Sequence, residues 1–287
     1  MATPNPAPVL DVREVARKVR GQPTSDGAGV RMTRVIGSGA LDSFDPFLLL
    51  DEFRSDDPND YIGGFPDHPH RGFETVTYML AGRMRHGDNQ GNTGLLGPGS
   101  VQWMTAGKGI VHSEFPEQEE GLMWGFQLWV NLPAKDKLTK PRYQDIQGDA
   151  IPEVDLGPGA RAKVLVGSVG GVAGPVTDVA TEPVYFDLHL EPGADYTATL
   201  PEGHNAFAYV YQGDANIGAA STAVERGELA LLTRGTELPV TAGEQGARLI
   251  VVAGRPLNEP VARYGPFVMN TVEEIHQAFA DYRAGRL

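Results

Sequence analysis

The sequence predicts an all-β protein built from two β-barrels, and three observations support that fold class. Apolar runs of strand length, rich in β-branched and aromatic residues, recur along the chain. Gly and Pro are frequent, at 36 and 22 residues, and they punctuate nearly every gap between those runs. The length of 287 residues allows one large or two moderate domains. Short strands at this spacing are typical of β-sandwiches and β-barrels.

The candidate strands are spread through both halves of the chain. The run at 46–53 is apolar and closed by charged residues, and the run at 73–80 continues until Ala81-Gly82 breaks it. Three more runs in the first half lie at 100–105, 109–115 and 122–130. Those in the second half lie at 162–169, 184–190, 206–211, 228–233 and 247–253.

The two halves are weak copies of each other. In each half a turn, at 96–101 or 224–229, precedes a strand that runs into a bend containing Thr105 or Thr233. A stretch rich in Pro, Gly and Asp at 144–159 is a plausible linker. We therefore expect an N-terminal barrel over residues 1–148. A C-terminal barrel with a terminal helix is expected over 149–287.

One helix is predicted, at the C-terminal end. Asn270 or Thr271 can cap it, with Glu273 or Glu274 three residues further on. Its apolar residues fall on one face at helical spacing: Val272, Ile275, Phe279 and Tyr282. Ala284-Gly285 ends it. That face is expected to pack on a barrel or across the domain junction, whereas His276 lies off the stripe and is expected to be solvated.

Charge and cysteine content exclude several classes of function. The net charge is -13, from 24 basic and 37 acidic residues, so phosphate backbones and anionic membrane surfaces repel the protein. The absence of cysteine excludes disulfides, thiol catalysis and Cys-type zinc sites. Neither a signal peptide nor a membrane-spanning run of about 18 apolar residues is found, so a cytoplasmic location is expected.

Two short segments carry the residues of a candidate metal site. His68 and His70 are two apart, and so are His112 and Glu114. On an extended backbone residues i and i+2 point to the same face, so each pair projects together. If the two strands face each other across a barrel, four ligands converge. The alternative is that these polar residues line a solvent-exposed barrel mouth.

Imidazole and carboxylate ligands suit iron(II) best, with manganese, nickel, copper and zinc as alternatives. Four protein ligands leave about two of six octahedral positions for oxygen and a substrate. Glu74 has the same strand parity as His68 and His70 and is therefore the rival carboxylate ligand, or a partner that orients an imidazole.

At this point the sequence resembles the pirin family of the cupin superfamily. The resemblance rests on the blocks at 46–53, 65–76 and 102–114, and on a block at 265–271 that looks like bacterial members. It implies a bicupin, two jelly-roll β-barrels packed together, with a metal in the N-terminal barrel only. The ligand pattern of the family falls on His68, His70, His112 and Glu114. Other cupins use the position of Glu74 for the carboxylate.

The second half departs from a metal-binding cupin pattern. His204 stands alone where a metal site needs a pair of histidines, and no His-X-Glu follows near 230–236. We therefore expect His204 to be structural and the C-terminal barrel to hold no metal.

The resemblance implies two classes of role, and fold alone does not choose between them. The first is an iron-dependent dioxygenase that binds O2 and a phenolic substrate, such as quercetin. There Glu114 is the general base and the ring sits against Phe65, Phe73, Trp103 and Met104. The second is a redox-responsive regulatory module whose Fe(II)/Fe(III) change alters binding of a protein partner. A third option is a zinc cupin that acts as a sugar isomerase or scaffold.

Overall fold

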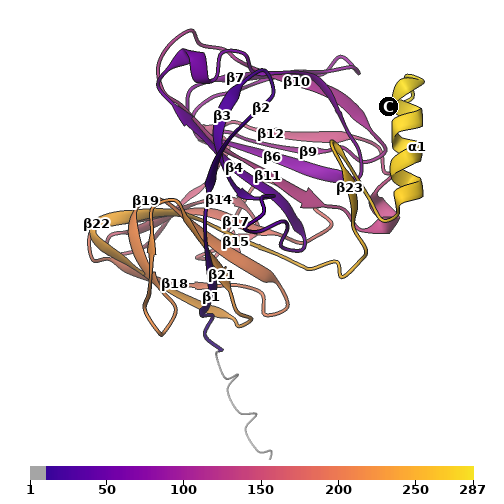
Figure 1. The fold of residues 1–287 in the computed structure, drawn as a ribbon. Helices are drawn as coiled ribbons and strands as arrows, with labels where there is room; N and C mark the ends of the chain where they lie inside the picture. Colours follow the sequence, from indigo (N-terminus) through magenta and orange to yellow (C-terminus); the bar gives the residue numbers. More distant parts are fainter. Residues whose placement is uncertain (1–10) are drawn as a thin grey trace, which may run out of the picture.

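The computed structural model describes residues 11–287, which form two β-domains packed against each other (Figure 1). Each domain is a sandwich of antiparallel strands, as the alternation of apolar runs and turns predicts. The predicted all-β fold with two barrel-like domains is confirmed. The barrels are built from facing or folded sheets rather than from one closed ring of strands.

The first domain places a seven-stranded sheet opposite a four-stranded sheet. The larger sheet has the order β12 (Arg142–Ile146), β9 (Val101–Thr105), β6 (Phe73–Ala81), β11 (Met123–Asn131), β4 (Phe47–Ser55), β3 (Val30–Ile36) and β2 (Gln22–Asp26). The smaller has the order β5 (Phe65–His70), β10 (Ile110–Pro116), β7 (Met84–Asp88) and β8 (Thr93–Leu96). The space between them holds the candidate ligands.

The second domain is one nine-stranded sheet that folds over its own core. Its main path is β1 (Val15–Arg20), β21 (Glu228–Leu232), β19 (Asn205–Ile217), β22 (Glu237–Gly254), β17 (Val184–Leu190), β14 (Ala160–Val166) and β13 (Glu153–Gly157), with β18 (Asp195–Thr199) on β22 and β20 (Thr222–Glu225) on β19. The long strands β19 and β22 take part in both layers, so the enclosed core is rich in Val, Ala and Leu.

The domains meet through a shared apolar core. The outer face of the seven-stranded sheet contributes Tyr78 and Phe126, and the second domain contributes Phe207, Tyr209 and Tyr211. The rings of Phe126 and Tyr211 lie 5.4 Å apart between centroids. In each of the two sheets that meet, apolar residues on the outer face alternate along the strands with residues that point into the barrel. The two apolar outer faces therefore pack against each other.

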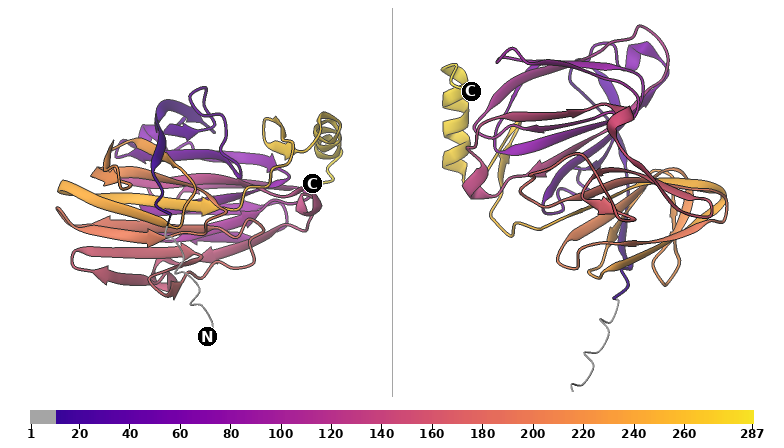
Figure 2. Two further views of the ribbon diagram at one scale, coloured as in Figure 1. Left: turned by 90° about the horizontal axis from the view of Figure 1, so that it is seen from below. Right: turned by 180° about the vertical axis from the view of Figure 1, so that it is seen from behind.

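Each end of the chain crosses to the other domain. Strand β1 pairs with β21 of the second domain, although it precedes the whole first domain in sequence. After β22, the hairpin of β23 (Ala262–Tyr264) and β24 (Phe267–Met269) returns to the first domain with helix α1 (Val272–Arg283). Figure 2 shows α1 standing beside the first domain. The predicted division at residues 148 and 149 therefore needs correction at both ends.

The first turn of helix α1 is capped as the sequence predicts. Thr271 accepts a hydrogen bond from the Glu274 backbone N–H, and the Glu274 side chain accepts one from the Thr271 N–H, which completes a capping box. Of the predicted apolar face, Ile275 is buried and Phe279 is half-buried, but Val272 and Tyr282 are exposed, so only part of that face packs against the protein. His276 is exposed as expected. Short 3-10 turns at Pro58–Asp60, Ala134–Asp136 and Gly148–Ala150 and a small hairpin of β15 (Ser168–Val169) and β16 (Val172–Ala173) complete the elements. No helix within residues 11–287 combines the length and apolar character needed to cross a membrane.

Candidate metal centre

Strands β5 and β10 carry the candidate ligands as direct neighbours in the four-stranded sheet. His112 lies opposite His68 and Ile110 lies opposite His70 in the antiparallel register. The expectation that the two strands face each other across the barrel is therefore corrected to side-by-side pairing. Strand β5 lies at the edge of the sheet. This position suits Pro66 and Pro69, because proline has no backbone N–H to donate to a neighbouring strand.

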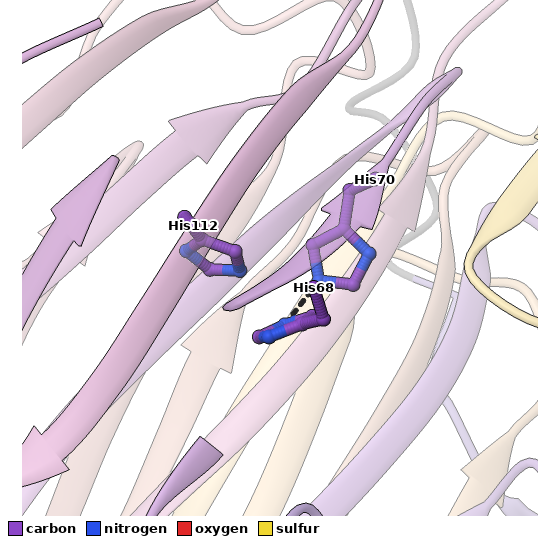
Figure 3. A group of neighbouring side chains, drawn as sticks. All are labelled: His68, His70 and His112. Carbon is purple, nitrogen blue, oxygen red and sulfur yellow. Dashed lines mark hydrogen bonds between the residues drawn. The ribbon is translucent and has the colours of Figure 1, made fainter. Parts of the chain in front are cut away.

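Three imidazoles converge on one point between the sheets (Figure 3). The Nε2 atoms of His68 and His70 are 3.0 Å apart. The ring of His112 lies 4.4 Å from that of His68 and 5.0 Å from that of His70, measured between centroids. All three offer ligand atoms within 4.8 Å of one another. The predicted i, i+2 geometry thus places these histidines together.

Glu114 approaches two of these histidines from β10, although the cluster of mutually close ligand atoms contains the three histidines alone. Its Oε2 is 3.8 Å from His68 Nε2, and its Oε1 is 3.8 Å from His112 Nε2. The side chain is 7% exposed. Burial raises the pKa of the Glu114 carboxyl, while the positive potentials of His68 and His86 lower it. A β-bulge between His112 and Glu114 shifts the register at this position.

The histidines are in the form that binds metals. Burial, followed by the neighbouring histidines, lowers the pKa of His70 and of His112 well below the ordinary value of 6.5. Both rings are therefore neutral at neutral pH. The Nδ1 of His68 lies 2.9 Å from the Pro66 carbonyl oxygen. A hydrogen bond donated there leaves Nε2 as the free lone pair, pointing at the other imidazoles.

These donors fit a transition metal. Both ring nitrogens of the buried His112 lack a hydrogen-bond partner among the described residues. Buried polar atoms without partners are costly, so a ligand for them is expected. Donors that sit about 2.1 Å from one metal lie roughly 3–4 Å apart, which matches the spacing of this group.

The centre opens into a cavity of about 470 Å³. Phe65, predicted for the pocket wall, lines this cavity together with His68, His70 and Glu114. Most of the other lining residues come from strands of the seven-stranded sheet and from the β23–β24 hairpin; they include Asp26, Met32, Arg34, Leu49, Asp51, Phe53, Gln127, Trp129, Arg263, Gly265 and Pro266. The volume suits a small aromatic molecule.

The other predicted pocket residues lie elsewhere. Phe73 is fully buried behind His70, with ring centroids 5.0 Å apart, so it supports the ligand rather than lining the cavity. Met104 packs with Ile110 inside the first barrel. Trp103 points the other way, into the core between the domains. The expectation that Trp103 forms a pocket wall is corrected because β9 turns that face outward.

Glu74 also points away from the metal centre. It lies on the same face of β6 as Val76 and Tyr78, which pack against the second domain. Thr105 Oγ1 donates to its Oε1 over 2.6 Å, and burial raises its pKa. The even spacing between His70 and Glu74 does not place their side chains on one face, because the two residues lie on different strands. Gly72 adopts φ +87° between them and bends the chain from one sheet into the other. The rival ligand is thus excluded by geometry.

Sequence reasoning missed a buried histidine next to the ligands. His86 on β7 lies directly opposite Glu114, and its Nε2 is 3.0 Å from Asp145 Oδ2. A side chain at Gly94 would collide with both members of that pair, so glycine leaves room for them. The sequence His86-Gly87-Asp88 matches no metal-site motif. Only the strand register reveals that His86 lies beside Glu114.

Two family models match the chain. The pirin model covers residues 29–130 and the pirin C-terminal cupin domain model covers residues 185–287. The chain belongs to the pirin family. A Pseudomonas aeruginosa pirin relative, provisionally named as a quercetin 2,3-dioxygenase, is 51% identical over 284 residues, covering 96% of this chain and 98% of its own. Human pirin is 42% identical over 275 residues, covering 94% of this chain and 92% of its own.

A solved structure extends the pirin comparison to the fold. Quercetin 2,3-dioxygenase from Acinetobacter baumannii matches with a TM-score of 0.88 and 34% identity, covering 96% of this chain and 98% of that one. The bicupin architecture expected from the resemblance is therefore confirmed.

The second cupin domain of this pirin-family chain uses its histidine differently. His204 is buried, and its backbone carbonyl accepts a hydrogen bond from Arg13 over 3.0 Å. Arg13 also donates to the carbonyls of Pro201 and Thr233, so the loop around His204 anchors the crossing N-terminal segment. The absence of a metal from this domain stays a prediction.

Proposed function

We propose that this pirin-family protein is a metal-dependent dioxygenase, with iron(II) as its metal, that cleaves flavonols such as quercetin. The observation that supports it is a cluster of three imidazoles with a carboxylate beside two of them, which opens into a cavity of about 470 Å³. Manganese, nickel, copper and zinc accept the same donors. A bound divalent transition metal supplies Lewis acidity and access to oxygen chemistry.

The cavity walls orient a flat substrate toward the ligands. Phe65, Leu49 and Phe53 present apolar surface to the cavity, which favours binding of an aromatic ring. Gln127 supplies an amide on the same wall and is held by Thr77, whose Oγ1 lies 2.6 Å from Gln127 Oε1. The amide nitrogen is therefore free to donate to a substrate oxygen.

Glu114 is the candidate general base. It is the carboxylate closest to the imidazole nitrogens, and burial raises its pKa, which makes it a stronger proton acceptor than an exposed glutamate. The hydroxyl proton of a flavonol would move to a carboxylate oxygen of Glu114. A metal held by His68, His70 and His112 would stabilise the negative charge left on the substrate oxygen.

The test is oxygen uptake by iron(II)-loaded protein on addition of quercetin, with His112→Ala beside the wild type. We expect quercetin and oxygen to be consumed together, with carbon monoxide released as the central ring opens. Loss of one imidazole should reduce turnover by at least about 100-fold. His276→Ala, on the exposed side of α1, is the matched control and should retain full activity.

Either of two results would reject this function. Unchanged turnover in His112→Ala would show that the chemistry occurs elsewhere. No uptake by wild-type protein shown to hold one metal would favour the regulatory alternative. In that case affinity for a protein partner should differ between the oxidised and reduced forms.

A further inference from the structure

One cation in the cavity comes from outside both barrels. Arg263 lies on β23, in the hairpin that returns from the second domain to the first. It lines the same cavity as His68 and Glu114. The site is therefore completed by a segment near residue 263, more than 140 residues after the last ligand in sequence.

The structure holds Arg263 in place on the cavity wall. Its guanidinium carbon lies 4.9 Å from the centroid of the Trp129 ring, and its Nη1 donates to the Leu48 carbonyl over 3.0 Å. The hairpin is fixed in turn, because the Val268 N–H donates to the Arg71 carbonyl over 3.0 Å. These contacts orient the guanidinium before any substrate arrives.

Arg263 has no carboxylate partner within residues 11–287. Asp51 on the same wall is already paired, because its two oxygens accept from Arg34 Nε over 2.9 Å and from Arg34 Nη2 over 2.7 Å. Among the described residues, the exposed Arg263 side chain has a single hydrogen-bond partner, Leu48. A guanidinium carries five N–H donors in a planar fork, so most of its donors remain available.

The charges of the cavity would sum to a net positive value with a metal bound. Arg34 forms ion pairs with Asp51 and with Asp26, which also lines the cavity, so these three residues carry one negative charge in sum. A divalent metal with Glu114 as its carboxylate ligand would carry a net positive charge, and Arg263 places a second positive charge on the same cavity. Burial first, and then Arg34, lower the pKa of Arg263, whereas Asp42 and Asp51 raise it. An anionic substrate would offset the positive charge that remains in the cavity.

We propose that Arg263 is a carboxylate-binding residue and that the natural substrate is an aromatic acid. The acid would present phenolic oxygens to the metal centre and its carboxylate to the guanidinium fork, which matches a carboxylate through two parallel hydrogen bonds. This inference rests on the proposed function. Quercetin carries no carboxylate, so it is a surrogate substrate that leaves Arg263 unused.

Binding to zinc-loaded protein tests the inference without oxygen chemistry. The probes are two catechol acids of different length, protocatechuate and dihydrocaffeate, each beside its neutral primary amide. Their dissociation constants are measured by calorimetry for the wild type, Arg263→Gln and Arg263→Lys. Arg161→Gln, an exposed arginine of the second domain, is the control.

The wild type should bind at least one acid about tenfold or more tightly than its amide, because a charge-assisted hydrogen bond contributes free energy of that size. Arg263→Gln should abolish that preference and leave the affinity for the amides unchanged, which also shows that the cavity is intact. Arg263→Lys should keep part of the preference, because the charge remains but the fork is lost. Arg161→Gln should behave as the wild type.

The inference is overturned if neither acid is preferred by the wild type, or if the preference survives in Arg263→Gln. Its failure is separable from that of the proposed function. Oxygen uptake with quercetin and no acid preference would keep the dioxygenase and reject the carboxylate site. An acid preference that depends on Arg263, without oxygen uptake by the iron-loaded protein, would do the reverse.

Discussion

A single lysine ties together three segments around the metal centre. Lys137 is 1% exposed, and its Nζ donates to the Gly72 carbonyl over 2.8 Å, to Asn131 Oδ1 over 2.7 Å and to the Val268 carbonyl over 3.1 Å. Gly72 follows the ligand strand β5, and Val268 belongs to the hairpin that carries Arg263. Burial lowers the pKa of the Lys137 amine to about 8. Lys137 therefore links the segment after β5 to the β23–β24 hairpin, and burying its positive charge costs desolvation free energy.

Lys137→Met is expected to destabilise the protein by about 1–3 kcal/mol at pH 7, because three buried oxygens lose their donor. The pH dependence follows from the lowered pKa. Between about pH 8 and 10.5 the unfolded chain holds a proton that the folded protein has released, so Lys137 makes stability rise with pH there. Denaturation midpoints from about pH 8 to 9.5 should rise for the wild type relative to Lys137→Met. A constant difference would contradict the assignment.

The convergence of the three histidines could be predicted from the sequence, whereas their surroundings could not. His68, His70, His112 and Glu114 stand at i, i+2 spacing within two strands, and that spacing is a local property of extended backbone. Glu74 shares their parity in sequence, but a bend lies between it and the ligand strand. Arg34, Arg263 and His86 reach the site through strand pairing and chain crossing, for which no local pattern exists.

At the scale of elements, the Asp281 carboxylate links helix α1 to the first domain. Asp281 accepts from Arg71 Nη1 over 2.8 Å, and its other oxygen accepts from Arg286 over 2.7 Å and from Gln277 over 2.9 Å. These donors, Arg71 first, lower the pKa of Asp281 to about 2. Arg71 directly follows the ligand His70, so the helix contacts the base of the site.

Asp281→Asn should loosen α1, because Arg71, whose side chain is 7% exposed, loses its counter-charge. Amide exchange over Val272–Arg283 should accelerate by about tenfold or more at pH 7. The sign with pH is fixed by the lowered pKa: the contribution is complete above about pH 4 and is lost as pH falls through about 2. The variant and wild type should therefore converge in strong acid. Glu273→Gln, an exposed substitution on the same helix, should change nothing.

The helix also shows which elements a sequence can specify. The capping box of Thr271 and Glu274 is written in four consecutive residues, so the predicted start is confirmed. Where the helix docks depends on Arg71, about 200 residues earlier in the chain. Strand β1 poses the same problem, because its partner β21 lies on the far side of the first domain in sequence.

At the scale of the whole molecule, the two domains share too much to act separately. The inter-domain core includes Tyr78, Trp103 and Phe126 from one side and Tyr211 from the other. Buried polar links cross the same interface: the hydroxyl of Tyr78 donates to Asp187 of the second domain over 2.8 Å. Both ends of the chain also exchange between domains. The cavity beside the histidines also depends on the β23–β24 hairpin, which follows the second barrel in sequence.

This sharing predicts that the domains unfold as one unit. Phe186 is fully buried in the core that belongs to the second domain alone, and Phe186→Ala should cost about 3–5 kcal/mol. If the interface couples the domains, calorimetry of the metal-free variant should still give a single transition, moved to lower temperature with its full enthalpy. Independent domains would instead give two transitions, of which only the one belonging to the second domain moves. A single shifted transition means that a substitution far from the metal centre lowers the population of folded sites, because no path unfolds the second domain while leaving Arg263 on its wall.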